Sequence, residues 1–153
     1  MKIKIIVIGK TKDKYFQEAE SEFVKRISGF AQVEELVLKE EDKGNIEQIK
    51  KAEGGKILEK LDNDCFNIAL DQNGKNLASE EFAKLIREQR DFGKGKISFI
   101  IGGTYGLSNE VLSKVDFKFS FSKMTFTHIM IRVFLLEQIY RAFTIIKGKK
   151  YHY

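Results

Sequence analysis

The chain has 153 residues, of which 42% are hydrophobic and 32% charged, and its formal net charge is +5. A chain of this length and composition can bury a full hydrophobic core, which excludes disorder as its overall state. Its single cysteine, Cys65, excludes an internal disulfide, and two histidines leave no Cys/His spacing for a structural zinc ion. Apolar stretches are too short to cross a membrane, and the N-terminus has no signal-peptide cleavage site. We therefore expect one soluble, cytoplasmic domain, residues 1–153, without a metal and without membrane contact.

The positive charge is concentrated at one end of the chain. Residues 115–153 contain seven basic and two acidic residues, whereas residues 1–114 contain equal numbers of basic and acidic residues. The C-terminal sequence KGKKYHY interleaves basic and aromatic side chains. This pattern is typical of a protein that binds nucleic acid or phosphate, although a solvated basic tail has the same composition.

Short apolar runs and helical spacings alternate along the chain. The apolar runs predict five strands, at residues 3–8, 33–38, 65–70, 97–101 and 117–121. Apolar residues three and four positions apart predict helices at about 15–27, 45–61, 79–92, 108–112 and 128–146. Because the strands are apolar throughout rather than at every second position, both faces of the sheet should be covered. The predicted fold class is α/β, a mostly parallel sheet with helices on both faces.

Capping and turn residues set the expected limits of these elements. Asn45, with Gln48 three residues later, forms the pattern of a capping box. Ser79 and Ser108 are expected to cap two later helices, and Phe92 should point inward from the first of them. The run DQNG at 71–74 predicts a turn that closes the third strand.

The predicted helix at 128–146 is apolar nearly all the way round. A helix of this kind has to be covered on every side. One sheet can cover only one side, so we expect a second copy of the chain to bury the other side in an isologous homodimer. Neighbouring helices of the same chain are the alternative cover.

Three strand ends carry sequences suited to a ligand, because parallel α/β sheets bind ligands beyond the carboxyl ends of their strands. These are Leu70 with Asp71, the glycine-rich run 102–106, and residues 122–126. The run GGTYG matches neither the dinucleotide-binding pattern nor a P-loop, which disfavours a hydride-transfer enzyme or an ATPase. No GxSxG elbow supports a hydrolytic triad. A glycine-rich turn also occurs for purely structural reasons, so on the residues alone both interpretations stay open.

Several motifs in one order are more specific. FIIGGTYGLS, FSFSKMTFTH, IRVFLLEQIYRAF and the terminal YHY, with MKIKIIVIGKTKDKY at the start, resemble the RlmH family of ribosomal RNA methyltransferases within the SPOUT class. The resemblance covers the whole chain and implies a SPOUT-type, trefoil-knotted α/β fold that acts as a homodimer. It also implies methyl transfer from S-adenosyl-L-methionine to N3 of a pseudouridine, position 1915 in the helix 69 loop of 23S rRNA, in assembled 70S ribosomes.

The resemblance assigns cofactor-binding positions that coincide with the three strand ends. They are Leu70, Gly102, Phe121, Ser122, Lys123, Met124, Thr125 and Phe126. Bent backbone there can hydrogen-bond the adenine edge of the cofactor, while Leu70, Phe121 and Met124 supply an apolar wall. Ordinary core packing is the alternative role for Leu70 and Phe121.

The basic last helix and tail supply the candidates for binding the RNA that the resemblance implies. They are Arg132, Arg141, Tyr151, His152 and Tyr153. Tyrosine and histidine side chains can stack on unpaired RNA bases. Either arginine could instead pair with Glu137 inside the chain. His152, whose ordinary pKa is about 6.5, is the candidate catalytic residue, which orients the substrate and accepts the proton from N3.

Three residues depart from the family pattern. Thr127 and Ile129 replace the usual Pro and Gln on either side of the motif histidine, and Tyr153 replaces a terminal basic residue. Thr127 can cap the last helix in place of proline. Two other classes of protein remain as alternatives. A non-enzymatic RNA-binding module leaves the glycine-rich run unexplained, and a small-nucleotide-binding enzyme leaves the basic C-terminus unexplained.

Overall fold

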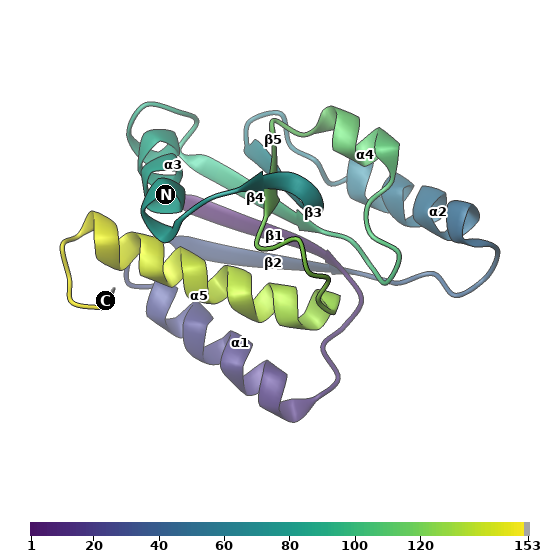
Figure 1. The fold of residues 1–153 in the computed structure, drawn as a ribbon, viewed down its shortest axis with the longest axis horizontal. Helices are drawn as coiled ribbons and strands as arrows, with labels where there is room; N and C mark the ends of the chain where they lie inside the picture. The colour runs from purple at the N-terminus through teal and green to yellow at the C-terminus, as the bar shows by residue number, and fades with distance from the viewer. Residues whose placement is uncertain (152–153) are drawn as a thin grey trace.

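The structure, a computed structural model, describes residues 1–151, in which strands and helices alternate along the chain (Figure 1). The strands are β1 (Lys2–Ile8), β2 (Gln32–Leu38), β3 (Phe66–Asn76), β4 (Lys96–Ile101) and β5 (Phe117–Ser120). The helices are α1 (Lys14–Ile27), α2 (Ile46–Leu58), α3 (Ser79–Asp91), α4 (Asn109–Lys114) and α5 (His128–Ile146). None of the helices described is long and apolar enough to cross a membrane.

The five strands form one parallel sheet with the order β2-β1-β4-β3-β5. The predicted α/β class with a parallel sheet is therefore confirmed. The order places β4, β3 and β5 next to one another, so their carboxyl ends share one edge of the sheet. The trefoil knot implied by the resemblance stays a prediction.

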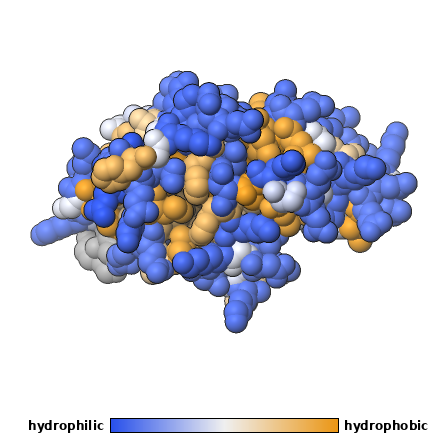
Figure 2. Space-filling view, turned by 90° about the horizontal axis from the view of Figure 1, so that it is seen from above, coloured by the Kyte–Doolittle hydropathy of each residue, from blue (hydrophilic) through white to orange (hydrophobic). Residues whose placement is uncertain are grey.

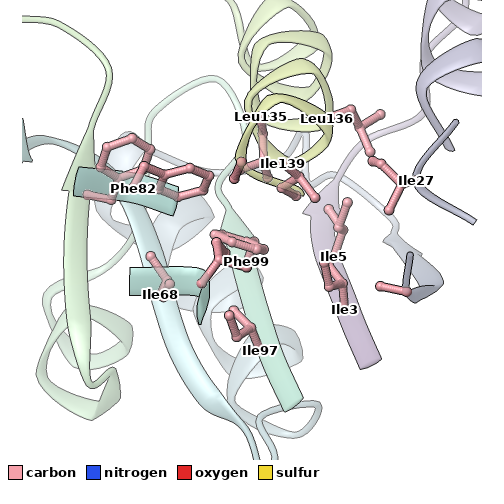
Figure 3. Packing of buried hydrophobic residues seen from close by; sticks show 14 of the residues in the cluster. Ile3, Ile5, Ile27, Ile68, Phe82, Ile97, Phe99, Leu135, Leu136 and Ile139 are labelled. Carbon is pink, nitrogen blue, oxygen red and sulfur yellow. The ribbon is translucent and has the colours of Figure 1, made fainter. Parts of the chain in front are cut away.

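Helices cover both faces of the sheet, as the continuous apolar strands predict. The first core cluster joins Ile5 of β1 and Phe99 of β4 to side chains of α1, α3 and α5 (Figure 3). The second joins Ile6 and Ile100, the next residues of the same strands, to side chains of α2 and α4. Each of these four side chains is 0% exposed. Burying one side chain of this size stabilises the fold by roughly 1.5–3 kcal/mol, which is why these strands contain no polar alternation.

The last helix, α5, lies between α1 and α3 (Figure 1). Its inward positions are fully buried: Leu135, Leu136, Ile139, Ala142 and Phe143. Four other apolar positions are only half-buried and belong to neither core cluster: Ile129, Met130, Val133 and Phe134. We call these four residues the α5 outer strip. Neighbouring helices thus cover part of α5, and covering of the α5 outer strip by a second copy stays a prediction.

Strand β3 is longer than the sequence predicts. The expected turn at 71–74 lies inside it, as an irregularity between Leu70 and Lys75, both of which pair with Phe119 of β5. The strand then continues to Asn76, whose side chain donates a hydrogen bond of 2.9 Å to the carbonyl of Ser120. The predicted strand end was wrong because the neighbouring strand offers hydrogen-bond partners to a bulged backbone.

Three helices begin as predicted. The Asn45 side chain accepts the Gln48 backbone N–H and the Gln48 side chain accepts that of Asn45, each at 2.9 Å. The hydroxyls of Ser108 and Thr127 likewise cap α4 and α5. These bonds satisfy donors that have no partner within the helix.

Helix α3 departs from the prediction at both ends. Ser79 is its first residue rather than its cap, and the Glu81 carboxylate accepts the Ala78 backbone N–H at 2.7 Å. At the other end, Phe92 lies just beyond the helix and is 89% exposed, not inward. The helix ends at Asp91, one residue before the position at which the apolar spacing predicts a buried ring.

Candidate functional site

The predicted cofactor-binding stretches lie within one strand, β3, and directly after its two neighbours, β4 and β5. Leu70 in β3 is opposite Phe119 of β5, Gly102 directly follows β4, and residues 121–126 follow β5. Because β3 pairs with both β4 and β5, all three stretches share one edge of the sheet. Parallel α/β sheets place their ligand sites at such an edge.

The first stretch is a tight turn, residues 102–106, which we call the glycine loop. The Gly106 backbone N–H donates to the Gly103 carbonyl at 3.0 Å. Gly106 has φ +77°, a conformation that favours glycine. A Cβ on Gly102 would lie 2.7 Å from the Gly106 carbonyl carbon, so the turn closes only with glycine at 102.

The second stretch, residues 121–126, connects β5 to α5, and we call it the β5–α5 segment. The Ser120 hydroxyl donates to the Ser122 carbonyl at 2.8 Å, and the Ser122 hydroxyl accepts the Met124 backbone N–H at 3.0 Å. Among the residues that the structure describes, the backbone N–H groups of Thr125 and Phe126 donate to no protein group. The segment is therefore a bent backbone with free donors, which suits the edge of a heterocyclic base.

Apolar side chains line the same edge. The Phe121 ring lies 4.8 Å from the Phe119 ring and 6.4 Å from the Phe134 ring, measured between centroids. Leu70 and Phe121 are half-buried and pack against the first core cluster, whereas Met124 is 72% exposed. Core packing thus accounts for the inward side of Leu70 and Phe121, and their remaining surface is free to face a ligand.

Arg132 does not have the role that the sequence suggests. Its side chain is 4% exposed, and it donates to the Thr11 hydroxyl at 2.6 Å and to the Gly9 carbonyl at 3.2 Å. Its ion-pair partner is Glu20, at 3.4 Å, and not Glu137. The prediction that Arg132 contacts RNA was wrong for this fold, because its charge is used in the interior, where an unpaired arginine would be costly.

Arg141 forms the ion pair considered as its alternative. Its guanidinium donates twice to one Glu137 oxygen, at 3.0 and 2.6 Å. The same oxygen accepts the Tyr151 hydroxyl at 3.3 Å, and the Arg141 guanidinium lies 4.9 Å from the Tyr151 ring centroid. Burial and the Glu137 charge both raise the pKa of Tyr151. We call Glu137, Arg141 and Tyr151 the tail clamp, since it holds the start of the C-terminal tail against α5.

The remaining predicted RNA-binding residues, His152 and Tyr153, lie outside the described residues. Of the basic residues just before them, Lys149 places its Nζ 5.2 Å from the Phe30 ring centroid. Lys147 and Lys150 are exposed. The positive charge of the tail therefore stays at the surface next to the tail clamp.

The structure adds His128, for which the sequence indicates no role beyond its place in a motif. This half-buried first residue of α5 has its Nε2 3.4 Å from the point that a Cβ on Gly9 would occupy. A carboxylate oxygen of Glu40 lies 3.2 Å from the same point. Burial lowers the pKa of His128 and outweighs the opposite effect of Glu40, so the neutral imidazole is favoured.

The structure also adds Glu53 of α2, which is 3% exposed. Its Oε1 accepts the Glu41 backbone N–H at 3.0 Å, and its Oε2 is buried without a hydrogen-bond partner. Burial raises the pKa of this carboxyl. Nothing in the sequence singles out Glu53, because it lies among other charged residues in a helix whose sequence is typical of a solvent-exposed one. No cluster within residues 1–151 has three potential metal ligands.

Comparison with known proteins gives the class of this α/β protein. Residues 1–152 match the family model described as "Predicted SPOUT methyltransferase". A solved structure of a probable methylase family protein from Haemophilus influenzae Rd KW20 has a similar fold, with a TM-score of 0.54 at 19% identity, over 99% of this chain and 70% of that one. The chain therefore belongs to the SPOUT methyltransferase family.

Curated relatives carry a narrower name. The chain is 46% identical to Ribosomal RNA large subunit methyltransferase H of Carboxydothermus hydrogenoformans, over 99% of both chains. It is 48% identical to the protein of that name from Caldicellulosiruptor bescii, over 98% of this chain and 99% of that one. The motif resemblance to this branch of the SPOUT methyltransferases is thereby confirmed.

Proposed function

We propose that the protein transfers a methyl group from S-adenosyl-L-methionine to N3 of a pseudouridine in the helix 69 loop of 23S rRNA, on assembled 70S ribosomes. The observation that carries the proposal is that the glycine loop and the β5–α5 segment follow β4 and β5 at the same edge of the sheet. The printed name of the full-length relatives supports ribosomal RNA as the substrate. Action on ribosomes implies a cytoplasmic protein.

The residues at this edge fit S-adenosyl-L-methionine. The free backbone N–H groups of the β5–α5 segment suit the acceptor nitrogens of adenine, and Leu70 and Phe121 suit its apolar face. The glycine loop lets backbone approach the ligand closely at Gly102. When bound, the cofactor supplies an activated methyl group, so the protein has only to align N3 and accept its proton.

We assign the acceptance of that proton to His152, as the sequence predicts. The tail clamp supports the assignment, because Tyr151 is fixed to α5 by Glu137 and Arg141. A general base has to lie within hydrogen-bond reach of the proton that it accepts. Arg141, Tyr151 and Tyr153 remain the proposed RNA contacts, together with the exposed lysines of the tail.

A homodimer completes the proposal. The α5 outer strip continues into Met124, which is 72% exposed, and Phe126, which is 38% exposed. Seen from above, hydrophobic residues gather in the middle of one face between hydrophilic ones (Figure 2). Apolar surface of this kind is typical of an isologous interface. The dimer would place the interface directly beside the β5–α5 segment.

The test is methyl transfer from labelled S-adenosyl-L-methionine to 70S ribosomes, free large subunits and naked 23S rRNA. We expect label on 70S ribosomes alone, and on none that lack the helix 69 pseudouridines. Cofactor binding without transfer would contradict the proposed substrate. Absence of both would favour a non-enzymatic RNA-binding module.

A further inference from the structure

Two successive residues of helix α2 pack against the glycine loop and against the start of α4. In the loop, a Cβ on Gly103 would lie 2.8 Å from Oε2 and 3.1 Å from Oε1 of Glu53. Two residues beyond the loop, a Cβ on Gly54 would lie 2.4 Å from the hydroxyl of Ser108, the residue that caps α4. The loop and this turn of α2 are therefore in direct contact, without room for even a methyl group.

The Glu53 carboxyl also ties a third segment to the loop. Its Oε1 accepts the backbone N–H of Glu41, in the connection between β2 and α2, at 3.0 Å. Its Oε2 has no hydrogen-bond partner, although the residue is only 3% exposed. A buried acceptor without a partner is costly and needs an explanation.

The glycine loop holds donors of the matching kind. Among the described residues, the backbone N–H groups of Thr104 and Tyr105 donate to no protein group. These two residues directly follow Gly103, against which the unpartnered Glu53 oxygen packs. A buried acceptor without a partner and two exposed loop donors that bind no protein group thus adjoin one residue of the proposed cofactor loop.

We propose that Glu53 is a positioning residue for the cofactor, whose buried carboxyl fixes the glycine loop at Gly103 and whose Oε2 accepts a loop N–H when S-adenosyl-L-methionine binds. Glu53 acts through the loop and not by contact with the reacting atoms. The inference rests on the proposed function, since it takes the glycine loop to be a cofactor loop. Its raised pKa is consistent with a carboxyl sequestered from water.

The test compares cofactor binding by calorimetry and methylation kinetics for three variants. Glu53→Gln keeps an acceptor oxygen and the shape, Glu53→Asp withdraws the carboxyl by one methylene, and Glu53→Leu removes it. Ile57→Val, on the next turn of α2 and 1% exposed, is the matched control for loss of core packing away from the loop.

We expect Glu53→Asp and Glu53→Leu to weaken cofactor binding by roughly three- to tenfold, the loss typical of one hydrogen bond. The KM for the cofactor should rise by the same factor while kcat at saturation stays within about twofold. Glu53→Gln should restore most of the affinity, and amide exchange at 104–105 should be faster in Glu53→Leu than in Ile57→Val.

Two results would overturn the inference in different ways. If the wild-type chain binds no S-adenosyl-L-methionine, the proposed function fails and the role of Glu53 fails with it. If the wild type binds but Glu53→Asp matches Ile57→Val in affinity and KM, only the role of Glu53 is refuted. Should Glu53→Leu not fold, the comparison of Glu53→Asp with Glu53→Gln decides alone.

Discussion

Arg132 of α5 donates a hydrogen bond of 3.2 Å to the backbone carbonyl of Gly9, the residue that follows β1. The two residues are 123 positions apart in the sequence. The bond fixes the first turns of α5 at the carboxyl edge of the sheet. Since the β5–α5 segment leads directly into those turns, this buried arginine also helps to set where the proposed cofactor contacts lie.

Replacement of Arg132 should therefore cost stability. Arg132→Met leaves Glu20, which is 7% exposed, without its cation, and breaking such a buried pair typically costs about 3–5 kcal/mol. Urea unfolding measures the loss. The double variant with Glu20→Gln should regain part of it, because no uncompensated charge then remains. An Arg132→Met protein as stable as the wild type would contradict the buried pair.

Gly102→Ala should abolish cofactor binding while leaving the sheet intact. Its Cβ would lie 2.7 Å from the Gly106 carbonyl carbon, so the glycine loop would have to open. Gly55→Ala is the control, because a Cβ at this helical position meets nothing within 4 Å. The control should gain about 0.5–1 kcal/mol of stability and bind normally. Calorimetric titration with S-adenosyl-L-methionine distinguishes the two, and equal binding would remove the loop from the site.

Breaking the tail clamp should lower methylation of ribosomes more than it lowers stability. Glu137→Gln removes the charge shared by Arg141 and Tyr151, and a partly exposed pair of this kind is worth about 1 kcal/mol at most. We expect at least about a tenfold fall in kcat with unchanged cofactor affinity. Glu88→Gln, which breaks an exposed pair with Lys84 on α3, should leave both unchanged. Full methylation activity of Glu137→Gln would refute the proposed contribution of the tail clamp to methyl transfer.

The stability of the domain should depend on pH through His128. Burial lowers its pKa below the ordinary 6.5, so the unfolded chain takes up a proton at a higher pH than the folded chain does. This group therefore costs no stability above pH 6.5, and its cost grows as the pH falls below that value. Thermal unfolding between pH 5 and 8 should show a steeper loss on acidification for the wild type than for His128→Gln. Parallel curves would show that the imidazole is not sequestered.

Charge on the α5 outer strip should dissociate the proposed dimer. Val133→Glu places a carboxylate on a half-buried apolar position outside both core clusters. Sedimentation at micromolar concentration should give a dimer for the wild type and a monomer for the variant. Phe92→Glu, at a position 89% exposed beyond α3, should remain dimeric. A monomeric wild type would refute the dimer outright.

Much of the fold follows from local rules in the sequence. The parallel α/β class was predicted from strands such as β1 and β4, whose residues are buried on both faces in turn. Both limits of α5, at His128 and Ile146, agree with the prediction, and Thr127 caps its first turn. The path of β3 beyond Leu70 was not predictable, because it depends on a bulge matched to β5, a partner about 45 residues away.

The candidate site was likewise predictable only in those parts that depend on local sequence. The glycines after β4 and the segment after β5 are visible in the sequence, so these stretches could be named from it, and their role in cofactor binding stays a prediction. The role of Arg132 was mistaken because its partners come from far away in the sequence, Gly9 and Thr11 from the connection between β1 and α1 and Glu20 from α1. Glu53 was missed because burial of a glutamate on α2 depends on the glycine loop that packs on it. Whether a charged side chain lies in solvent or in the interior depends on tertiary packing between segments that are distant in the sequence.

The most direct single test is the transfer of labelled methyl groups to 70S ribosomes with and without the helix 69 pseudouridines. We predict label at N3 of one pseudouridine in the first preparation and none in the second. Equal label in both preparations would contradict the assigned base, and absence of label from both would contradict ribosomal methylation by this protein.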